Sequence, residues 1–273
     1  MTTFTLKYGT SSQTVELPSA RKLSVPALRD PSPADKLVRQ ALVATLGSPP
    51  LKQLVRPGDQ VVIVTSDITR YTGSEIYLPI IVDELNRCGI SDQQISILIG
   101  LGIHRKQSAA EHRKILGPLD GRIAVFDHDC DDPEQLVDLG LTDCGLPVQV
   151  NRRVVEADRV IVTGTIGIHY FAGFGGGRKG LVPGVASRNT CMATHFRIFN
   201  PPEQGGRNPL ARPANLAGNP VHQAIFEAAR MIGPDFLLNT VLSPDKQLLA
   251  VFAGDLEQAH LAGCELARSL YTV

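Results

Sequence analysis

Continuous apolar strands alternate with amphipathic helices from residue 60 of this 273-residue chain onward. Strands are predicted over 60–65, 94–100 and 159–164, and the first of them contains a continuous run of β-branched side chains. Such runs are typical of strands that are buried on both faces of a parallel sheet. Helices are predicted over 76–88 and 108–116 and from residues 187, 221 and 256. The alternation predicts an α/β fold, with a mostly parallel sheet and helices on both of its faces.

The N-terminal segment follows a different pattern. Residues 3–8 and 13–17 alternate polar and apolar side chains around a turn, which predicts a β-hairpin. An extended linker is predicted over 21–33, and a helix over 32–46. Further strands are predicted over 122–126, 236–241 and 248–253.

Composition argues against several classes of protein. The chain has 27 basic and 27 acidic residues, so its net charge does not favour binding to nucleic acid. No apolar stretch reaches the ~20 residues of a membrane span, and the first residues lack the plan of a signal peptide. The five cysteines are scattered and form no C-x-x-C pair, so we expect reduced thiols in a cytoplasmic protein. Cys191 is expected to be a small packing residue.

Polar side chains follow three of the predicted strands where each strand ends. Asp67 and Arg70 follow the first, His104 follows the second and His169 follows the third. Because ligands bind outside the carboxyl ends of strands in open parallel sheets, we expect one active-site crevice there. Arg70 is suited to bidentate binding of a small carboxylate, and the two histidines are acid/base candidates. An N-cap at Asp67 with a surface Arg70 is the alternative interpretation of the first cluster.

A glycine-rich loop, Gly173-Phe-Gly-Gly-Gly-Arg-Lys-Gly180, comes soon after the third strand. Its spacing does not fit a P-loop. Gly175, Gly177 and Gly180 match G-x-G-x-x-G, but the preceding strand ends too far upstream and no acidic residue follows at the expected distance, so a dinucleotide fingerprint is not supported. Its three successive glycines are Gly175, Gly176 and Gly177. Their backbone N–H groups and the Arg178 guanidinium are predicted to hold a phosphate. Lys179 is a counter-charge, a covalent attachment point or a solvated side chain, and these alternatives stay open.

The remaining histidines carry weaker signals. His195 lies on the predicted helix that begins near residue 187, which could bring it over the glycine-rich loop. His112 is expected at the surface and His128 in a solvated acidic turn, while His222 and His260 are left open. The chain contains no H-E-x-x-H motif, so a conventional zinc hydrolase is not supported.

Several of these segments together resemble the nickel-dependent lactate racemase family, specifically its N-terminal domain. The segments that carry the resemblance are 66–70, 102–105, 169–187 with 193–195, 218–222 and 254–260. The resemblance covers roughly residues 60–273, and the long central run makes it specific.

The resemblance implies a nickel cofactor. By resemblance, Lys179 is covalently linked to a nickel-pincer nucleotide, a pyridinium bis-thiocarboxylate mononucleotide. His195 matches the histidine that supplies the protein's ligand to nickel. Asp67 and Arg70 match residues that help to bind cofactor and substrate. The proteins that synthesise this cofactor are implied as partners.

The implied activity is racemisation or epimerisation of a small 2-hydroxy acid, lactate or a relative. The α-proton of such an acid is weakly acidic, so hydride transfer to the cofactor avoids a carbanion. Inversion in both directions requires acid/base groups on opposite faces of the substrate. By resemblance, these groups are His104 and His169.

Two departures from the family pattern bear on this interpretation. Many relatives carry Ser where Gly175 stands. Relatives also continue into a second domain, so we expect residues 1–273 to be the N-terminal cofactor-binding domain without the C-terminal one. Two other functions stay open: a nickel-independent enzyme domain for a nucleotide or other phosphate ligand, and a non-catalytic carrier of the cofactor.

Overall fold

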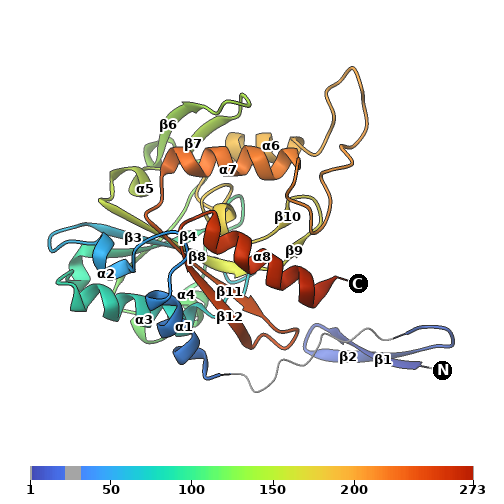
Figure 1. Ribbon diagram of the computed structural model, residues 1–273, viewed down its shortest axis with the longest axis horizontal. Helices are drawn as coiled ribbons and strands as arrows, with labels where there is room; N and C mark the ends of the chain where they lie inside the picture. Colours follow the sequence, from blue (N-terminus) through green and yellow to red (C-terminus); the bar gives the residue numbers. More distant parts are fainter. Residues whose placement is uncertain (1, 22–31, 273) are drawn as a thin grey trace.

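A six-stranded sheet forms the centre of the computed structural model, which describes residues 2–21 and 32–272 (Figure 1). Its strands are β3 (Val61–Ser66), β4 (Ile95–Gly100), β5 (Ala124–Asp127), β8 (Arg159–Ile166), β11 (Phe236–Leu242) and β12 (Leu248–Gly254). The order across the sheet is β12-β11-β8-β3-β4-β5, and every neighbouring pair is parallel except β11 with β12. The predicted α/β fold with a mostly parallel sheet is confirmed.

Helices cover both faces of this sheet, as the continuous apolar strands predict. The helices are α1 (Ala34–Val43), α2 (Leu51–Leu54), α3 (Ser74–Arg87), α4 (Ala109–Leu116), α5 (Arg152–Glu156), α6 (Arg188–Phe196), α7 (Pro220–Ile232) and α8 (Gln258–Tyr271). Along β3, Val61 and Ile63 pack toward α1 and α3, whereas Val62 and Val64 pack toward α7 on the other face. In Figure 1, α6 and α7 accordingly lie on the opposite side of the sheet from α1 and α3. None of the helices in the described ranges has the length and apolar character needed to cross a bilayer.

The predicted N-terminal hairpin is also present. β1 (Thr2–Tyr8) pairs with β2 (Ser11–Leu17) in antiparallel register, and most of its side chains are exposed. Figure 1 shows the hairpin lying apart from the central sheet. The predicted linker over 21–33 falls mostly outside the described residues.

The structure contains a second hairpin that the sequence analysis did not predict. It consists of β6 (Leu136–Leu141) and β7 (Pro147–Asn151). A register shift interrupts β6 beyond Asp138, and Gly140 has a positive φ of 90°. These features break the strand periodicity, so the sequence gives only a weak signal there. A short pair, β9 (Ile168–His169) with β10 (Gly173–Phe174), precedes the glycine-rich turn.

Three adjacent central strands position the predicted functional residues. β8, β3 and β4 are neighbours and run parallel, so the segments that follow them emerge at one edge of the sheet. The segment after β4 ends at Ser108, which begins α4 with a capping box that includes Glu111. This cap limits the loop that carries His104 to a few residues.

Candidate active site

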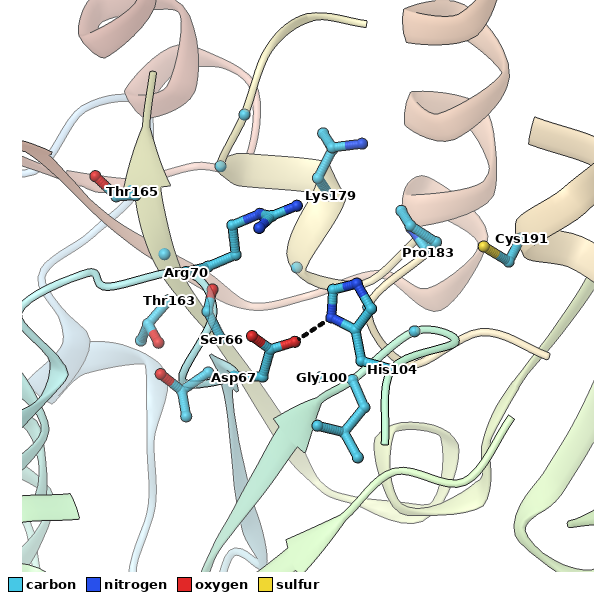
Figure 2. A pocket seen from close by; sticks show the side chains of 18 of the residues that line it. Ser66, Asp67, Arg70, Gly100, His104, Thr163, Thr165, Lys179, Pro183 and Cys191 are labelled. Atoms are coloured by element: carbon cyan, nitrogen blue, oxygen red, sulfur yellow. Dashed lines mark hydrogen bonds and ion pairs between the residues drawn. The ribbon is translucent and has the colours of Figure 1, made fainter. Parts of the chain in front are cut away.

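A cavity of about 260 Å³ lies at the carboxyl ends of β3, β4 and β8 (Figure 2). The predicted site residues that line it are Asp67, Arg70, His104, His169, Gly175, Gly176, Lys179 and His195. Two other predicted residues, Gly177 and Arg178, are outside the lining. The structure thus brings all three strand-end clusters and the Lys179 turn into one cavity.

Asp67 and His104 form the best-defined polar pair of the cavity. Asp67 is 3% exposed, and its Oδ1 accepts hydrogen bonds from the backbone N–H and the hydroxyl of Thr69, at 2.7 and 2.6 Å. Its Oδ2 lies 2.5 Å from Nδ1 of His104, as the dashed line in Figure 2 marks. A carboxylate can only accept, so Nδ1–H of His104 donates and Nε2 is left with a free lone pair. This arrangement suits a general base that is oriented by a buried carboxylate.

His169 has the opposite hydrogen-bonding pattern. Its Nδ1 accepts from the backbone N–H groups of Phe171 and Ala172, at 3.4 and 3.2 Å. Burial, and to a lesser extent nearby cations with Lys179 first among them, lower the pKa of His169 to about 3. His169 is therefore neutral at pH 7, and its one proton lies on Nε2. In this state the ring donates a hydrogen bond rather than accepting a proton.

Lys179 is held on a 3-10 turn, Gly177–Gly180, and is half-buried in the cavity wall. Burial, and secondly the Arg178 guanidinium, lower the pKa of its amine to about 7. A large fraction of the amine is consequently neutral at physiological pH. A neutral lysine amine is a nucleophile, so the placement suits covalent attachment of a ligand.

His195 and Cys191 face the cavity from α6, whose first turn is capped by Ser187. Nδ1 of His195 lies 2.7 Å from the carbonyl oxygen of Cys191, so Nδ1–H donates and Nε2 keeps its lone pair. Metal-binding histidines are commonly oriented by such a bond from the second ring nitrogen. The described part of the chain contains no group of three or more His, Cys, Asp or Glu side chains that would hold a metal. Any metal here would need most of its ligands from a bound molecule.

The glycines of the loop are required by close packing. Gly176 and Gly177 have φ values of +67° and +54°, which disfavour other residues. A Cβ on Gly176 would lie 2.7 Å from Oδ1 of Asn239, and one on Gly177 would lie 2.6 Å from the His260 ring. The N–H of Gly177 also donates to Oδ1 of Asn239, at 2.6 Å. The predicted role of Gly177 in holding a phosphate therefore does not match its position, because its N–H is already bonded inside the protein.

Arg178 likewise does not point a donor fork at the cavity. Its side chain is 0% exposed. Nη1 donates to Nε2 of His260 at 2.9 Å, and Nη2 donates to the carbonyl of Ala172 at 2.9 Å. Both arms of the fork are used behind the loop, so the predicted phosphate contact is not available in this conformation.

Two histidines outside the cavity also differ from expectation. His112 is half-buried, with Nε2 2.9 Å from Asp127, rather than free at the surface. His128 is 1% exposed, and its Nε2 lies 2.9 Å from the carbonyl of Ala186. The predicted solvated turn at His128 is wrong because this segment packs beneath the residues that precede α6, a contact between distant parts of the chain.

Several lining residues were not predicted as site residues. They are Thr163, Thr165, Gly180, Pro183, Gly184 and Cys191. Cys191 is buried, as expected of a packing residue, yet it also lines the cavity. Asn239 bonds to the N–H of Gly177 behind the loop. The sequence could have indicated this role, because Asn239 is a polar residue within the apolar run of β11.

Comparison with known proteins identifies the family. Residues 8–206 match the family described as the lactate racemase N-terminal domain. This chain belongs to that family. The lactate racemase of Thermoanaerobacterium thermosaccharolyticum is 33% identical over 281 residues, which cover 100% of this chain and 64% of the relative. The lactate racemase of Lactiplantibacillus plantarum is 33% identical, over 95% of this chain and 63% of the relative.

Solved structures give the same result. The lactate racemase apoprotein from T. thermosaccharolyticum superimposes with a TM-score of 0.85 and 33% identity, over 98% of this chain and 63% of that one. A protein from Thermotoga maritima shares the fold, with a TM-score of 0.69, at 22% identity. This lactate racemase family member thus spans less than two thirds of the length of these relatives.

Proposed function

We propose that residues 1–273 form the cofactor-binding domain of a racemase or epimerase that acts on a small 2-hydroxy acid, lactate or a relative. The relatives named lactate racemase support this reaction class. The observation that carries the proposal is that Lys179, His195, His104 and His169 line a single cavity. A reaction that inverts a centre requires groups on two sides of the substrate, and the two histidines come from different strand ends.

The residues of the cavity fit a lysine-tethered nickel-pincer nucleotide. Lys179 offers an amine that is partly neutral, and His195 offers one imidazole nitrogen to a metal. The described residues include no complete metal site, which is consistent with a nickel ion that takes its other ligands from the nucleotide. When bound, that nucleotide would supply the hydride acceptor.

The substrate would be held and deprotonated by residues of the β3 and β4 ends. Arg70 lines the cavity, and its only bonds within the described residues are weak ones of 3.4 Å to Thr69. Its guanidinium is therefore free to bind the carboxylate of a 2-hydroxy acid in bidentate geometry. His104, oriented by Asp67, would take the proton of the hydroxyl group at Nε2.

His169 would act on the other side of the substrate. In the state described here its Nε2–H would donate a hydrogen bond to the substrate oxygen. To accept a proton at Nε2, His169 must carry its own proton on Nδ1 and lose the two bonds from Phe171 and Ala172. Attachment of Lys179 to a ligand would remove one of the cations that lower the pKa of His169. Loading of the site would thus raise the pKa of His169 and make it a stronger base.

The first test is the mass of the protein after co-expression with the family's cofactor-synthesis proteins and nickel. We expect an adduct that contains nickel and sulfur and maps to the peptide of Lys179. The lactate racemase from T. thermosaccharolyticum, treated in parallel, is the positive control. An unmodified Lys179 beside a modified control would contradict the nickel proposal.

Two outcomes of this experiment would favour the alternatives. A phosphate-bearing ligand without nickel would point to a nickel-independent enzyme domain. If the adduct forms on Lys179 and the racemase activity is unchanged by His104→Ala, the domain would be a carrier of the cofactor. A carrier needs Lys179 and His195 but no base. Location in the cytoplasm stays a prediction, which rests on five cysteines that form no disulfide.

A further inference from the structure

Arg178 is a buried cation without a carboxylate partner. Its guanidinium is 0% exposed, and its partners are a neutral imidazole and a backbone carbonyl. Among the residues that the structure describes, its Nε has no hydrogen-bond partner. Arg178 forms no ion pair with any acidic side chain in residues 2–21 and 32–272. A buried charge without a counter-charge is costly, so its retention calls for a physical reason.

The groups around Arg178 do not neutralise it. Burial lowers the pKa of His260 well below its ordinary value, and Nε2 of His260 accepts the bond from Arg178. Burial also raises the pKa of Cys264 to about 12, so this nearby sulfur remains a neutral thiol. Burial lowers the pKa of Arg178 only to about 10, so the guanidinium stays charged at pH 7. The charge therefore acts on its surroundings without local compensation.

Lys179 follows Arg178 on the same short turn. The ionisable groups that line the cavity with Lys179 are Asp67, Arg70, His104, His169, Cys191 and His195. Besides Arg178, those that shift the pKa of its amine are Arg70 and Cys191. Arg70 is a second cation, and burial raises the pKa of Cys191, which keeps that thiol neutral. Lys179 thus lies in a half-buried position beside one buried and one exposed positive charge, and it forms no ion pair with a carboxylate in the part of the chain that the structure describes. Like charges favour the neutral form of an amine.

We propose that Arg178 is a positioning residue for Lys179: its buried guanidinium, which has no acidic partner in residues 2–21 and 32–272, opposes a second positive charge on the neighbouring side chain and so, together with burial, favours an amine that can form a covalent bond with a ligand. This inference rests on the proposed role of Lys179 as the attachment point. An ammonium ion has no lone pair, so only the neutral amine reacts. Attachment to a carboxylic or thiocarboxylic carbon forms one C–N bond, breaks one C–O bond and releases water, with no change of oxidation state.

The test measures the protonation of Lys179 in unloaded protein, so it does not depend on the nickel adduct. Trace labelling with acetic anhydride between pH 5 and 11, followed by peptide mass spectrometry, gives the midpoint of Lys179 reactivity. Lys36, exposed on α1, corrects for decay of the reagent. We expect a midpoint at about pH 7, against 10.5 for an ordinary lysine. A midpoint near the ordinary value would overturn the proposal without any variant.

Variants then separate charge from packing. Arg178→Met, or Arg178→Gln if Met prevents folding, should raise the midpoint by about 1 pH unit or more. His260→Met breaks the same hydrogen bond but keeps the Arg178 charge, so it should leave the midpoint within a few tenths of a unit. Arg188→Met removes an exposed cation that is paired with Asp131 and serves as the surface control. An unchanged midpoint in the Arg178 variants, or an equal shift in His260→Met, would show that Arg178 is only a packing residue.

Discussion

The two sides of the cavity hold their histidines in opposite ways. On the β4 side, His104 is 44% exposed and donates from Nδ1 to a carboxylate. On the β8 side, His169 is less exposed and accepts at Nδ1 from two backbone N–H groups. The first arrangement places a proton on Nδ1 and leaves Nε2 as the acceptor, whereas the second leaves the proton on Nε2. The same residue type is thus prepared as a base on one side and as a hydrogen-bond donor on the other.

His104 and His169 therefore have different charge surroundings before a cofactor is bound. Asp67 provides a negative charge to His104, whereas Lys179, Arg178 and Arg70 surround His169 with positive charge. In the proposed reaction, reversible inversion needs both histidines to exchange protons with the substrate. The β8 side must therefore change more than the β4 side when ligands bind.

Loss of His104 should have the largest effect. In the full-length, cofactor-loaded enzyme, His104→Ala should lower the racemisation rate by about 10³-fold, the usual contribution of a general base. The rate should be measured from each enantiomer separately by chiral chromatography. Equal activity of this variant and the native enzyme in both directions would remove His104 from the mechanism.

A smaller loss is expected when only the orientation of His104 is disturbed. Asp67→Asn keeps the size of the side chain but replaces one carboxylate oxygen with an NH2 group, which donates instead of accepting. We expect a rate loss of about 10²-fold, since the favoured tautomer of His104 changes. Asp129→Asn, which removes an ion pair with Lys106 outside the cavity, is the matched control. If both variants lose activity equally, the Asp67–His104 bond has no special role.

Without bound cofactor, the protein should lose stability in acid because His169 is buried in its neutral form. An unfolded histidine binds its proton near pH 6.5, but folded His169 binds it only near pH 3. Between these values the unfolded state binds more protons, so stability falls as the pH falls. His169→Gln should reduce this loss by about 2 kcal/mol between pH 7 and pH 4. Urea unfolding at the two pH values measures it, and an unchanged pH dependence would contradict the low pKa.

The smallest expected effect concerns the coupling of Lys179 to His169. Lys179→Met removes a cation next to His169, so the pKa of His169 should rise from its value of about 3. The expected rise is roughly 1 unit, measured by NMR titration of the ring protons. Lys36→Met, far from the cavity on α1, should leave the titration unchanged. A titration that also stays unchanged in Lys179→Met would mean that burial alone sets the pKa of His169.

The fold was predictable because its periodic signals are long. Val61–Thr65 and Ile95–Ile99 are nearly all apolar, and their helices carry clear caps, such as Ser108 before α4. The β6–β7 hairpin was not predictable, since its partners contact each other across an interrupted register and a glycine bend. Short strands of this kind depend on what they pack against.

The sequence by itself determined which residues follow the parallel strands, and parallel register then requires Asp67, His104 and His169 to share one edge of the sheet. It also marked Lys179 and His195, through a run of residues long enough to resemble one family. Only the tertiary structure decided how each group is used. The direction of each histidine's hydrogen bond and the burial of Arg178 depend on partners such as Ala172 and His260 that come from other elements. Hydrogen-bond direction and charge burial are properties of the surroundings in space, and no local pattern in the chain encodes them.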